Sequence, residues 1–231
     1  VAKRVDYCIA AGTKAEYYLK QIGIDNCSVA IDSSTSPEID GNIDIRTQFS
    51  IPKEKRIILF MGRLVSRKGC CLLIKALINE LNNLNACLII AGDGPEKELC
   101  EKLSNNNKNI LLVGKVQPCN RRYFYEQSDV FVIPSICEKG VIEAWGLTVN
   151  EALECGLPVI ATDIVGSAYD LINAKNGIVV KNNDEIELYN AVKRILSNDE
   201  LYISERIKSC YEKYSVKNMA KSFAEILGDE I

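Results

Sequence analysis

The sequence contains no histidine, so it lacks the side chain that most often serves as a general base in enzymes. Ten cysteines are present, but no two of them have C-x-x-C spacing, which argues against the common zinc and dithiol motifs. Several of them, such as Cys87 and Cys155, stand where apolar residues are expected. We interpret them as small hydrophobic residues of a reduced, cytoplasmic chain, and we expect neither a metal site nor a bound cofactor.

Strong charge and long apolar runs are also absent. The formal net charge of −3 does not support broad electrostatic binding to nucleic acid or to anionic lipid. Any anion site must therefore be a local cluster of positive groups. No apolar run approaches the length of a membrane span, and no signal peptide opens the chain. With 231 residues, 47% of them apolar, the chain can bury one full core.

Short apolar runs alternate with helical patterns from Arg56 onward. Six runs are expected to be strands, at residues 57–61, 86–91, 109–113, 130–133, 159–161 and 177–180. Strands this apolar, alternating with helices, are typical of a parallel sheet that is covered on both faces. The sequence therefore predicts an α/β protein with a doubly wound, Rossmann-like sheet. No G-x-G-x-x-G follows the first strand, which disfavours a dehydrogenase.

Other segments complete the expected secondary structure. Strands at 5–11 and 27–31 flank a helix that Thr13 is expected to cap, and the polar segment 32–50 is interpreted as a linker or domain boundary. Pro95 stands where the first residue of a helix is expected. Further helices are expected at 69–81, around Tyr123, from Gly146, from Gly166, and at 184–196, 200–211 and 215–227.

Two carboxylates frame the start of one expected helix. Glu143 and Glu151 stand eight positions apart with Gly146 between them, and apolar residues at helical spacing follow this glycine. The free N–H groups at such a helix N-terminus, near Gly146, Leu147 and Thr148, suit a phosphate. Carboxylates suit sugar hydroxyls instead. Together these groups predict a nucleotide-sugar site.

A basic loop follows the first strand of the sheet. Gly62, Arg63 and Lys68 lie in it, at the carboxyl end of the strand, where open α/β sheets bind ligands. Two fixed positive charges suit a diphosphate leaving group. The alternative is a solvated basic turn.

Two later loops are weaker candidates. Gly92 and Gly94 follow the second strand and form either a nucleotide-cradling turn or a tight connection between strand and helix. Lys115 and Val116 follow the third strand, and Lys115 is read equally well as a solvent-facing lysine.

The segment that begins at Glu143 and runs to Thr162 resembles the E-x7-E motif of retaining glycosyltransferases with the two-domain GT-B fold, family 4 in particular. Trp145 stands where this family usually has Phe. The spacing G-R-x4-K-G at 62–69 also matches, and the resemblance covers about residues 53–231. It implies a nucleoside-diphosphate sugar as donor, a hydroxyl acceptor, and transfer with retention of configuration.

The resemblance also implies roles for the candidate residues. Arg63 and Lys68 would stabilise the departing diphosphate, and Glu143 would contact the donor sugar. Glu151 would bind the ribose hydroxyls, and Trp145 and Leu147 are expected to have packing side chains. The turn at 92–94 would lie at the rim of the donor pocket, and the loop at 115–116 would meet the base.

One departure from the family pattern concerns the approach to the first glutamate. An insertion at 136–142 brings a second acid, Glu138, ahead of Glu143. A longer donor-pocket loop would affect the choice of sugar, and the insertion leaves open which acid faces the sugar. The glycine-aligned spacing favours Glu143.

A GT-B resemblance implies a division of the chain. Residues 1–40 would be the remnant of the N-terminal acceptor domain, 41–52 a linker, 53–212 the nucleotide-sugar-binding domain and 213–231 a C-terminal crossover helix. The acceptor, a glycan or a lipid-linked sugar, would bind through the missing N-terminal domain. The chain begins with Val rather than Met, which suggests a fragment of a cytoplasmic protein. Because a GT-B active site lies between two domains, we expect this fragment to bind nucleotide weakly and to transfer nothing alone. The fragment itself indicates no membrane contact, and peripheral contact through the missing domain stays open.

Two other functions share these features. A nucleotide-sugar epimerase has the same fold, although the E-x7-E spacing speaks against it. A non-catalytic nucleotide- or sugar-binding module is of a different class, and the retention of every charged motif position does not favour it.

Overall fold

A six-stranded parallel sheet forms the body of the protein. The computed structural model describes residues 6–35 and 43–228, and its main sheet has the strand order β5-β4-β3-β6-β7-β8. The strands are β3 (Arg56–Met61), β4 (Ala86–Ala91), β5 (Ile110–Gly114), β6 (Val130–Ile133), β7 (Val159–Thr162) and β8 (Gly177–Val180). This order is that of a doubly wound sheet, with a switch of direction between β3 and β6. The predicted fold class is confirmed.

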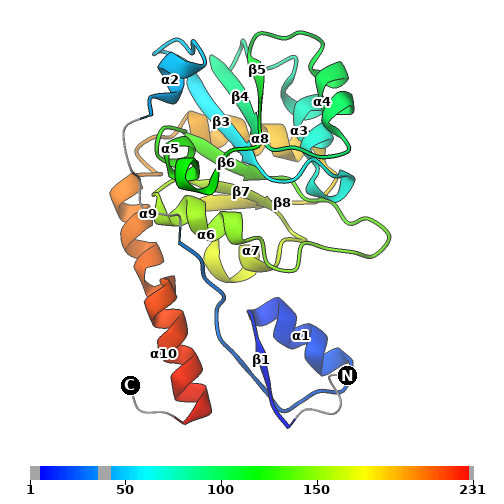
Figure 1. Ribbon diagram of the computed structural model, residues 1–231, viewed down its shortest axis with the longest axis vertical. Helices are drawn as coiled ribbons and strands as arrows, with labels where there is room; N and C mark the ends of the chain where they lie inside the picture. Colours follow the sequence, from blue (N-terminus) through cyan, green and yellow to red (C-terminus); the bar gives the residue numbers. More distant parts are fainter. Residues whose placement is uncertain (1–5, 36–42, 229–231) are drawn as a thin grey trace.

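Helices cover both faces of the sheet (Figure 1). On one face lie α3 (Cys70–Leu77), α4 (Lys97–Ser104) and α8 (Glu185–Leu196); on the other lie α5 (Arg121–Glu126), α6 (Leu147–Glu154), α7 (Gly166–Leu171) and α9 (Ser204–Tyr211). Because neither face of the sheet meets water, all six residues of β4 and all four of β6 and β7 are buried. Burying each of their larger side chains contributes about 1.5–3 kcal/mol.

A smaller unit precedes this body in the chain. Here β1 (Cys8–Ala10) and β2 (Cys27–Val29) pair in parallel on either side of α1 (Thr13–Gln21). The unit is tied to α7 and its preceding loop, since the Lys14 ammonium donates to the Asp163 carbonyl at 2.6 Å and the Thr13 N–H donates to Asp170 at 3.0 Å. The predicted cap at Thr13 is wrong: Gly12 is the N-cap, and the Thr13 hydroxyl bonds to Asp170 instead.

The expected linker contains structured residues of the main body. A short helix, α2 (Ile45–Gln48), has Asp44 as its N-cap, whose carboxylate accepts from the N–H groups of two helix residues. Ile45 is fully buried, and Ile51 belongs to the same core cluster. Residues 44–51 therefore pack against the main sheet, because local capping and two apolar anchors outweigh the polar composition. The boundary expected between residues 40 and 41 lies outside the described residues.

Several element boundaries differ from the prediction. Pro95 is not in the first turn of α4, which begins at Lys97, because the Glu96 N–H donates to the Leu64 carbonyl of the neighbouring loop. Helix α3 ends at Leu77 rather than at residue 81, and helix α9 begins at Ser204 rather than at residue 200. Tertiary contacts set these ends, whereas the sequence pattern shows only where apolar residues recur.

The last helix, α10 (Val216–Leu227), extends from the main body to the end of the molecule where β1 and α1 lie (Figure 1). Ser215 caps it by accepting from the Asn218 N–H, as the expected start at 215 implies. None of the described helices combines the length and the apolar character that crossing a bilayer requires.

Candidate functional site

A cleft of about 380 Å³ opens at the carboxyl edge of the sheet. The loops that follow β3, β4 and β5 form it together with the first residues of α5 and α6. This is the position beside the topological switch where doubly wound sheets bind ligands. Its lining residues are Met61, Gly62, Arg63, Ala91, Gly92, Asp93, Lys115, Val116, Arg121 and Thr148.

Glycines let two of these loops approach each other closely. A Cβ atom at Gly92 would lie 1.9 Å from the Gly62 carbonyl oxygen, and one at Gly94 would lie 2.4 Å from the Leu64 carbonyl oxygen. The Leu64 N–H donates to the Asp93 carbonyl at 2.9 Å. No larger residue fits at position 92, so the predicted glycine turn forms the rim of the cleft for a steric reason.

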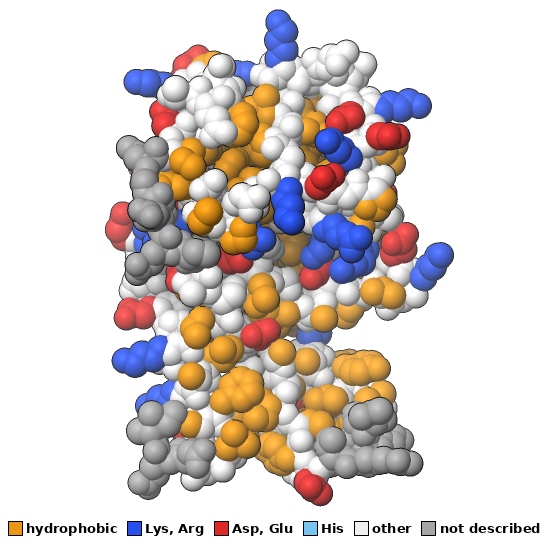
Figure 2. All heavy atoms as spheres, viewed as in Figure 1, with side chains coloured by type: hydrophobic (Ala, Val, Ile, Leu, Met, Phe, Trp, Pro, Cys, Tyr) orange, Lys and Arg blue, Asp and Glu red, His pale blue; other side chains and the backbone are white. Residues whose placement is uncertain are grey.

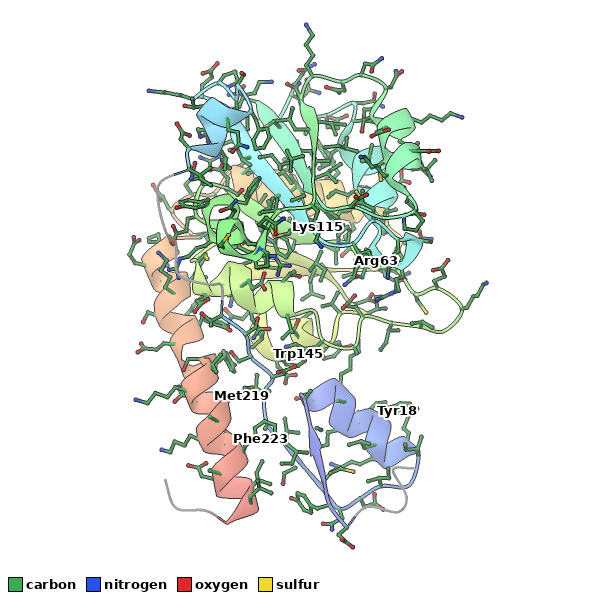
Figure 3. All side chains as sticks on the ribbon, viewed as in Figure 1. Tyr18, Arg63, Lys115, Trp145, Met219 and Phe223 are labelled. Carbon is green, nitrogen blue, oxygen red and sulfur yellow. The ribbon has the colours of Figure 1, made fainter. Side chains whose placement is uncertain are left out.

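Cations outnumber carboxylates among the residues that line the cleft. Three cations line it, Arg63, Lys115 and Arg121, against the single carboxylate of Asp93. Figure 3 labels Arg63 and Lys115, which line the same cleft, and Figure 2 shows Lys and Arg side chains gathered over the middle of this face. Such a concentration of fixed cations suits a ligand with two or more negative charges.

Lys68 and Glu143 meet at the end of the basic loop. The Lys68 ammonium lies 2.5 Å from Glu143 Oε2, and the Arg67 guanidinium donates to the same oxygen at 3.2 Å. Glu143 has only 12% of its side chain exposed, against 41% for Arg67. Gly69 allows this approach, because at φ +68° it lies against the Pro134 carbonyl where a Cβ atom would not fit. Arg67, which has no predicted role, is a second cation on Glu143.

The backbone that carries Glu143 is fixed by the start of α7. The Gly166 N–H donates to the Glu143 carbonyl at 2.9 Å, and the Ser167 N–H and hydroxyl both donate to the Trp145 carbonyl. A Cβ atom at Gly166 would lie 1.9 Å from the Ala144 carbonyl oxygen. The glycine therefore permits the close contact that sets the position of Glu143.

Glu151 lies in α6, and two side chains of the neighbouring helix α5 hold its carboxylate. It is 7% exposed; the Tyr125 hydroxyl donates to Oε2 at 2.7 Å, and the Arg121 guanidinium lies 3.4 Å from Oε1. Burial first, and then the Glu151 charge, raise the pKa of Tyr125 well above its ordinary value, so the phenol stays a donor. One carboxylate oxygen is thus anchored in the core, and the other points toward a cation of the cleft.

The N-terminus of α6 adjoins the same cleft. Gly146 is the N-cap at φ +93°, as the sequence predicts, and Thr148 in the first turn lines the cleft. The Val149 N–H donates to the Gly146 carbonyl at 2.9 Å, whereas the two N–H groups before it, at Leu147 and Thr148, are placed to meet an anion. Trp145 is buried and donates to Asn150, which confirms its packing role, whereas the expectation for Leu147 is wrong because its side chain is 43% exposed.

The structure brings together most, but not all, of the residues that the sequence singles out. Six predicted residues line the cleft directly: Gly62, Arg63, Gly92, Lys115, Val116 and Thr148. Gly94 and Gly146 shape the adjoining loops. Lys68 and Glu143 form an ion pair beside the cleft, and Glu151, inside α6, pairs with Arg121. Glu138 is exposed in a tight hairpin of the 136–142 insertion, where its backbone pairs with Val141. Between the two acids, Glu143 is the one beside the site cations.

Arg121 and Tyr125 were missed by sequence reasoning. The available signal is slight, an Arg-Arg pair that opens the helix after the Lys115 loop. Within residues 6–35 and 43–228, no group of three or more Cys, Asp and Glu side chains is arranged to hold a metal ion.

The sequence is similar to one known protein family and to several known proteins. The sequence family described as "Glycosyl transferases group 1" matches residues 42–229. An uncharacterised glycosyltransferase of Methanocaldococcus jannaschii, MJ1607, is 34% identical over 193 residues, which cover 80% of this chain and 47% of that protein. The lipopolysaccharide 1,2-N-acetylglucosaminetransferase of Salmonella typhimurium is 27% identical, over 79% of this chain and 50% of that protein. The chain thus spans about half the length of these relatives.

Solved structures share the fold. Sucrose-phosphate synthase from Thermosynechococcus elongatus aligns with a TM-score of 0.81 at 21% identity, covering 98% of this chain and 59% of that one. HepE from Anabaena, in complex with UDP-glucose, aligns with a TM-score of 0.81 at 20% identity, covering 98% and 65%. Both alignments extend over the β1–α1–β2 unit as well as the main sheet.

Proposed function

Since the chain belongs to the glycosyl transferases group 1 family, we propose that its whole protein transfers a sugar from a nucleoside diphosphate to a hydroxyl acceptor. The single observation that carries this proposal is the cationic cleft at the switch point, where Arg63, Lys115 and Arg121 surround space for a diphosphate. We propose further that transfer retains the configuration of the sugar, as in GT-B enzymes of family 4. The acceptor would be a glycan or a lipid-linked sugar, bound through an N-terminal domain.

The proposed mechanism is electrostatic. As the bond between sugar and diphosphate breaks, negative charge grows on the leaving group, and Arg63, Lys68 and the N-terminus of α6 stabilise it. The departing diphosphate itself helps to remove the proton of the incoming hydroxyl. Glu143 holds the sugar in position, and its contact with Lys68 keeps the two groups adjacent before the donor arrives.

Nucleoside recognition uses the other end of the cleft. We propose that Glu151 accepts hydrogen bonds from the ribose hydroxyls, with its carboxylate oriented by Tyr125 and Arg121. Lys115 and Val116 would contact the base. Because a structural relative carries UDP-glucose, a UDP-sugar is the first donor to test.

The proposed division of the chain follows from this function. Residues 53–212 would bind the donor, 1–40 would belong to an acceptor domain, 41–52 would connect the two and 213–231 would cross back to the first. A cytoplasmic location, with peripheral membrane contact through the acceptor domain, fits a lipid-linked acceptor. Alone, residues 1–231 would bind nucleotide weakly and transfer nothing.

Calorimetry with UDP-, GDP- and ADP-sugars tests the donor site. We expect binding of one class, weakened by Arg63→Ala and unchanged by the control Lys53→Ala, whose exposed side chain lies before β3. In the whole protein, Arg63→Ala or Lys68→Ala should raise the barrier by about 2.7–4 kcal/mol, as removal of one oxyanion-hole donor does. Near-normal turnover of both variants would refute the mechanism.

Product analysis with a labelled donor separates the alternatives. Transfer of label to an acceptor supports the proposal. Conversion of the donor to its epimer would indicate an epimerase, and binding without release of nucleoside diphosphate would indicate a non-catalytic module.

A further inference from the structure

Three thiols meet behind the cleft, where α3 packs against α4. Cys71 Sγ lies 3.8 Å from Cys100 Sγ, and Cys70 is the neighbour of Cys71 in α3. Cys70 and Cys100 are fully buried, whereas Cys71 is half-buried and also contacts the Glu96 carboxylate at 3.7 Å. All ten cysteines are free thiols. Within the part of the chain that the structure describes, Cys71 and Cys100 are the one pair in which a partly exposed thiol contacts a buried thiol.

We propose that Cys71 and Cys100 are a redox modification site, which forms a reversible disulfide between α3 and α4 by exchange with a small-molecule disulfide. A disulfide bond is about 2.05 Å long, so the two sulfurs must approach by less than 2 Å from their present 3.8 Å. The proposal requires the two side chains to rotate toward each other by this distance. Reversible disulfides of reduced chains are typically of this sensing kind.

The exchange has two steps. The Cys71 thiol loses its proton to solvent, and the thiolate attacks one sulfur of the external disulfide; the first sulfur–sulfur bond breaks and one small thiolate leaves. Cys100, as its thiolate, then attacks Cys71 Sγ in the mixed disulfide and expels the second small thiolate. The protein loses two protons and two electrons, and the external disulfide is reduced to two thiols.

The surroundings of the thiols suit this order of attack. Cys71 is the member of the cluster that solvent reaches, so it meets the oxidant first. Hydrogen bonds from Cys70 and Cys71 lower the pKa of Cys100 against its burial, which favours its thiolate as the resolving group. Burial raises the pKa of Cys71 to about 12, with Cys100 and Glu96 adding to the effect. The first step is therefore slow at neutral pH and accelerates as the pH rises.

The cross-link would stabilise the donor side of the protein. Helix α3 begins directly after the Lys68 loop and α4 directly after the Gly94 turn, and the Leu64–Asp93 hydrogen bond already joins these loops. The disulfide closes a loop of about 30 residues, for which chain-entropy and size relations give a rise in melting midpoint of about 7–15 °C. The bond would tie the two loops together without entering the cleft.

Peptide mapping tests the proposal. The chain is incubated with oxidised glutathione at mildly alkaline pH, alkylated without reduction and digested with trypsin. We expect residues 69–75 to be linked to 98–102, an intact mass lower by two hydrogens, a higher melting midpoint, and reversal of all three by dithiothreitol.

Four variants locate the bond. Cys71→Ser and Cys100→Ser should abolish both the linked peptides and the rise in melting midpoint, whereas Cys70→Ala and the exposed control Cys119→Ser should keep them. Linked peptides that persist in Cys71→Ser would assign the bond to Cys70 and overturn the proposal. Absence of the link in the unaltered chain, or glutathione that stays on Cys71 without resolution, would also overturn it.

Discussion

Replacing Tyr125 by Phe removes one oxygen atom and tests how Glu151 is held. The Tyr125 hydroxyl is fully buried and donates at 2.7 Å to a carboxylate that is itself 7% exposed. A hydrogen bond to a charged group contributes about 1.5–3 kcal/mol, and Phe fills the same volume without leaving a cavity for the ring. The loss therefore reports on the Glu151 hydrogen bond rather than on packing.

The expected magnitude follows from this range. For a chain of this size, about 1.5–3 kcal/mol corresponds to a fall in melting midpoint of about 3–12 °C. A carboxylate that loses its anchor also loses orientation toward the ribose, so we expect up to about tenfold weaker nucleotide binding, equivalent to about 1.4 kcal/mol. Differential scanning calorimetry and titration calorimetry measure the two effects separately.

Tyr211→Phe is the matched control. It removes another buried hydroxyl, which contacts Asn150 Nδ2 at 3.0 Å and Ser33 at 3.2 Å but does not touch Glu151. We expect a lower melting midpoint with unchanged nucleotide affinity. Should Tyr125→Phe leave both quantities at the values of the unaltered chain, the argument that Tyr125 holds Glu151 fails.

The remaining predictions concern pH, the glycine rim and the two candidate acids. Because the pKa of Tyr125 is raised in the folded state, only the unfolded chain releases the phenol proton above a pH of about 10. The free energy of unfolding should therefore fall by about 1.4 kcal/mol per pH unit in that range. Alkaline denaturation of Tyr125→Phe should lack this contribution. Gly92→Ala places a Cβ atom 1.9 Å from the Gly62 carbonyl oxygen, so calorimetry should detect no nucleotide binding, whereas Gly62→Ala, with Phe60 at 3.6 Å, should fold like the unaltered chain. In the whole protein, Glu143→Gln should reduce turnover about 100-fold through lost positioning, and the exposed control Glu138→Gln should leave it unchanged; the opposite ranking would assign the sugar to Glu138.

Local pattern was sufficient for most of the fold. The strand at 86–91 could be predicted to the residue, because an unbroken apolar run between polar segments has few other ways to avoid water. The start of α6 was equally clear, since Gly146 takes a positive φ that other residues avoid. By contrast, α2 was missed, because the anchor that makes it fold is the contact of Ile45 with a core built from distant strands.

In the candidate site, too, the positions of single residues followed from local sequence, whereas the contacts between them did not. The sequence by itself determined that Arg63 and Lys68 lie in a loop after a strand, and that Glu143 and Glu151 lie before and inside one helix, because each placement depends on a few neighbouring residues. Only the tertiary structure decided that Lys68 meets Glu143 and that α5 supplies Arg121 and Tyr125 to Glu151. These contacts join segments 26 to 75 positions apart. Their existence depends on the order of strands in the sheet and on the crossing of its helices, which no local pattern of residues records.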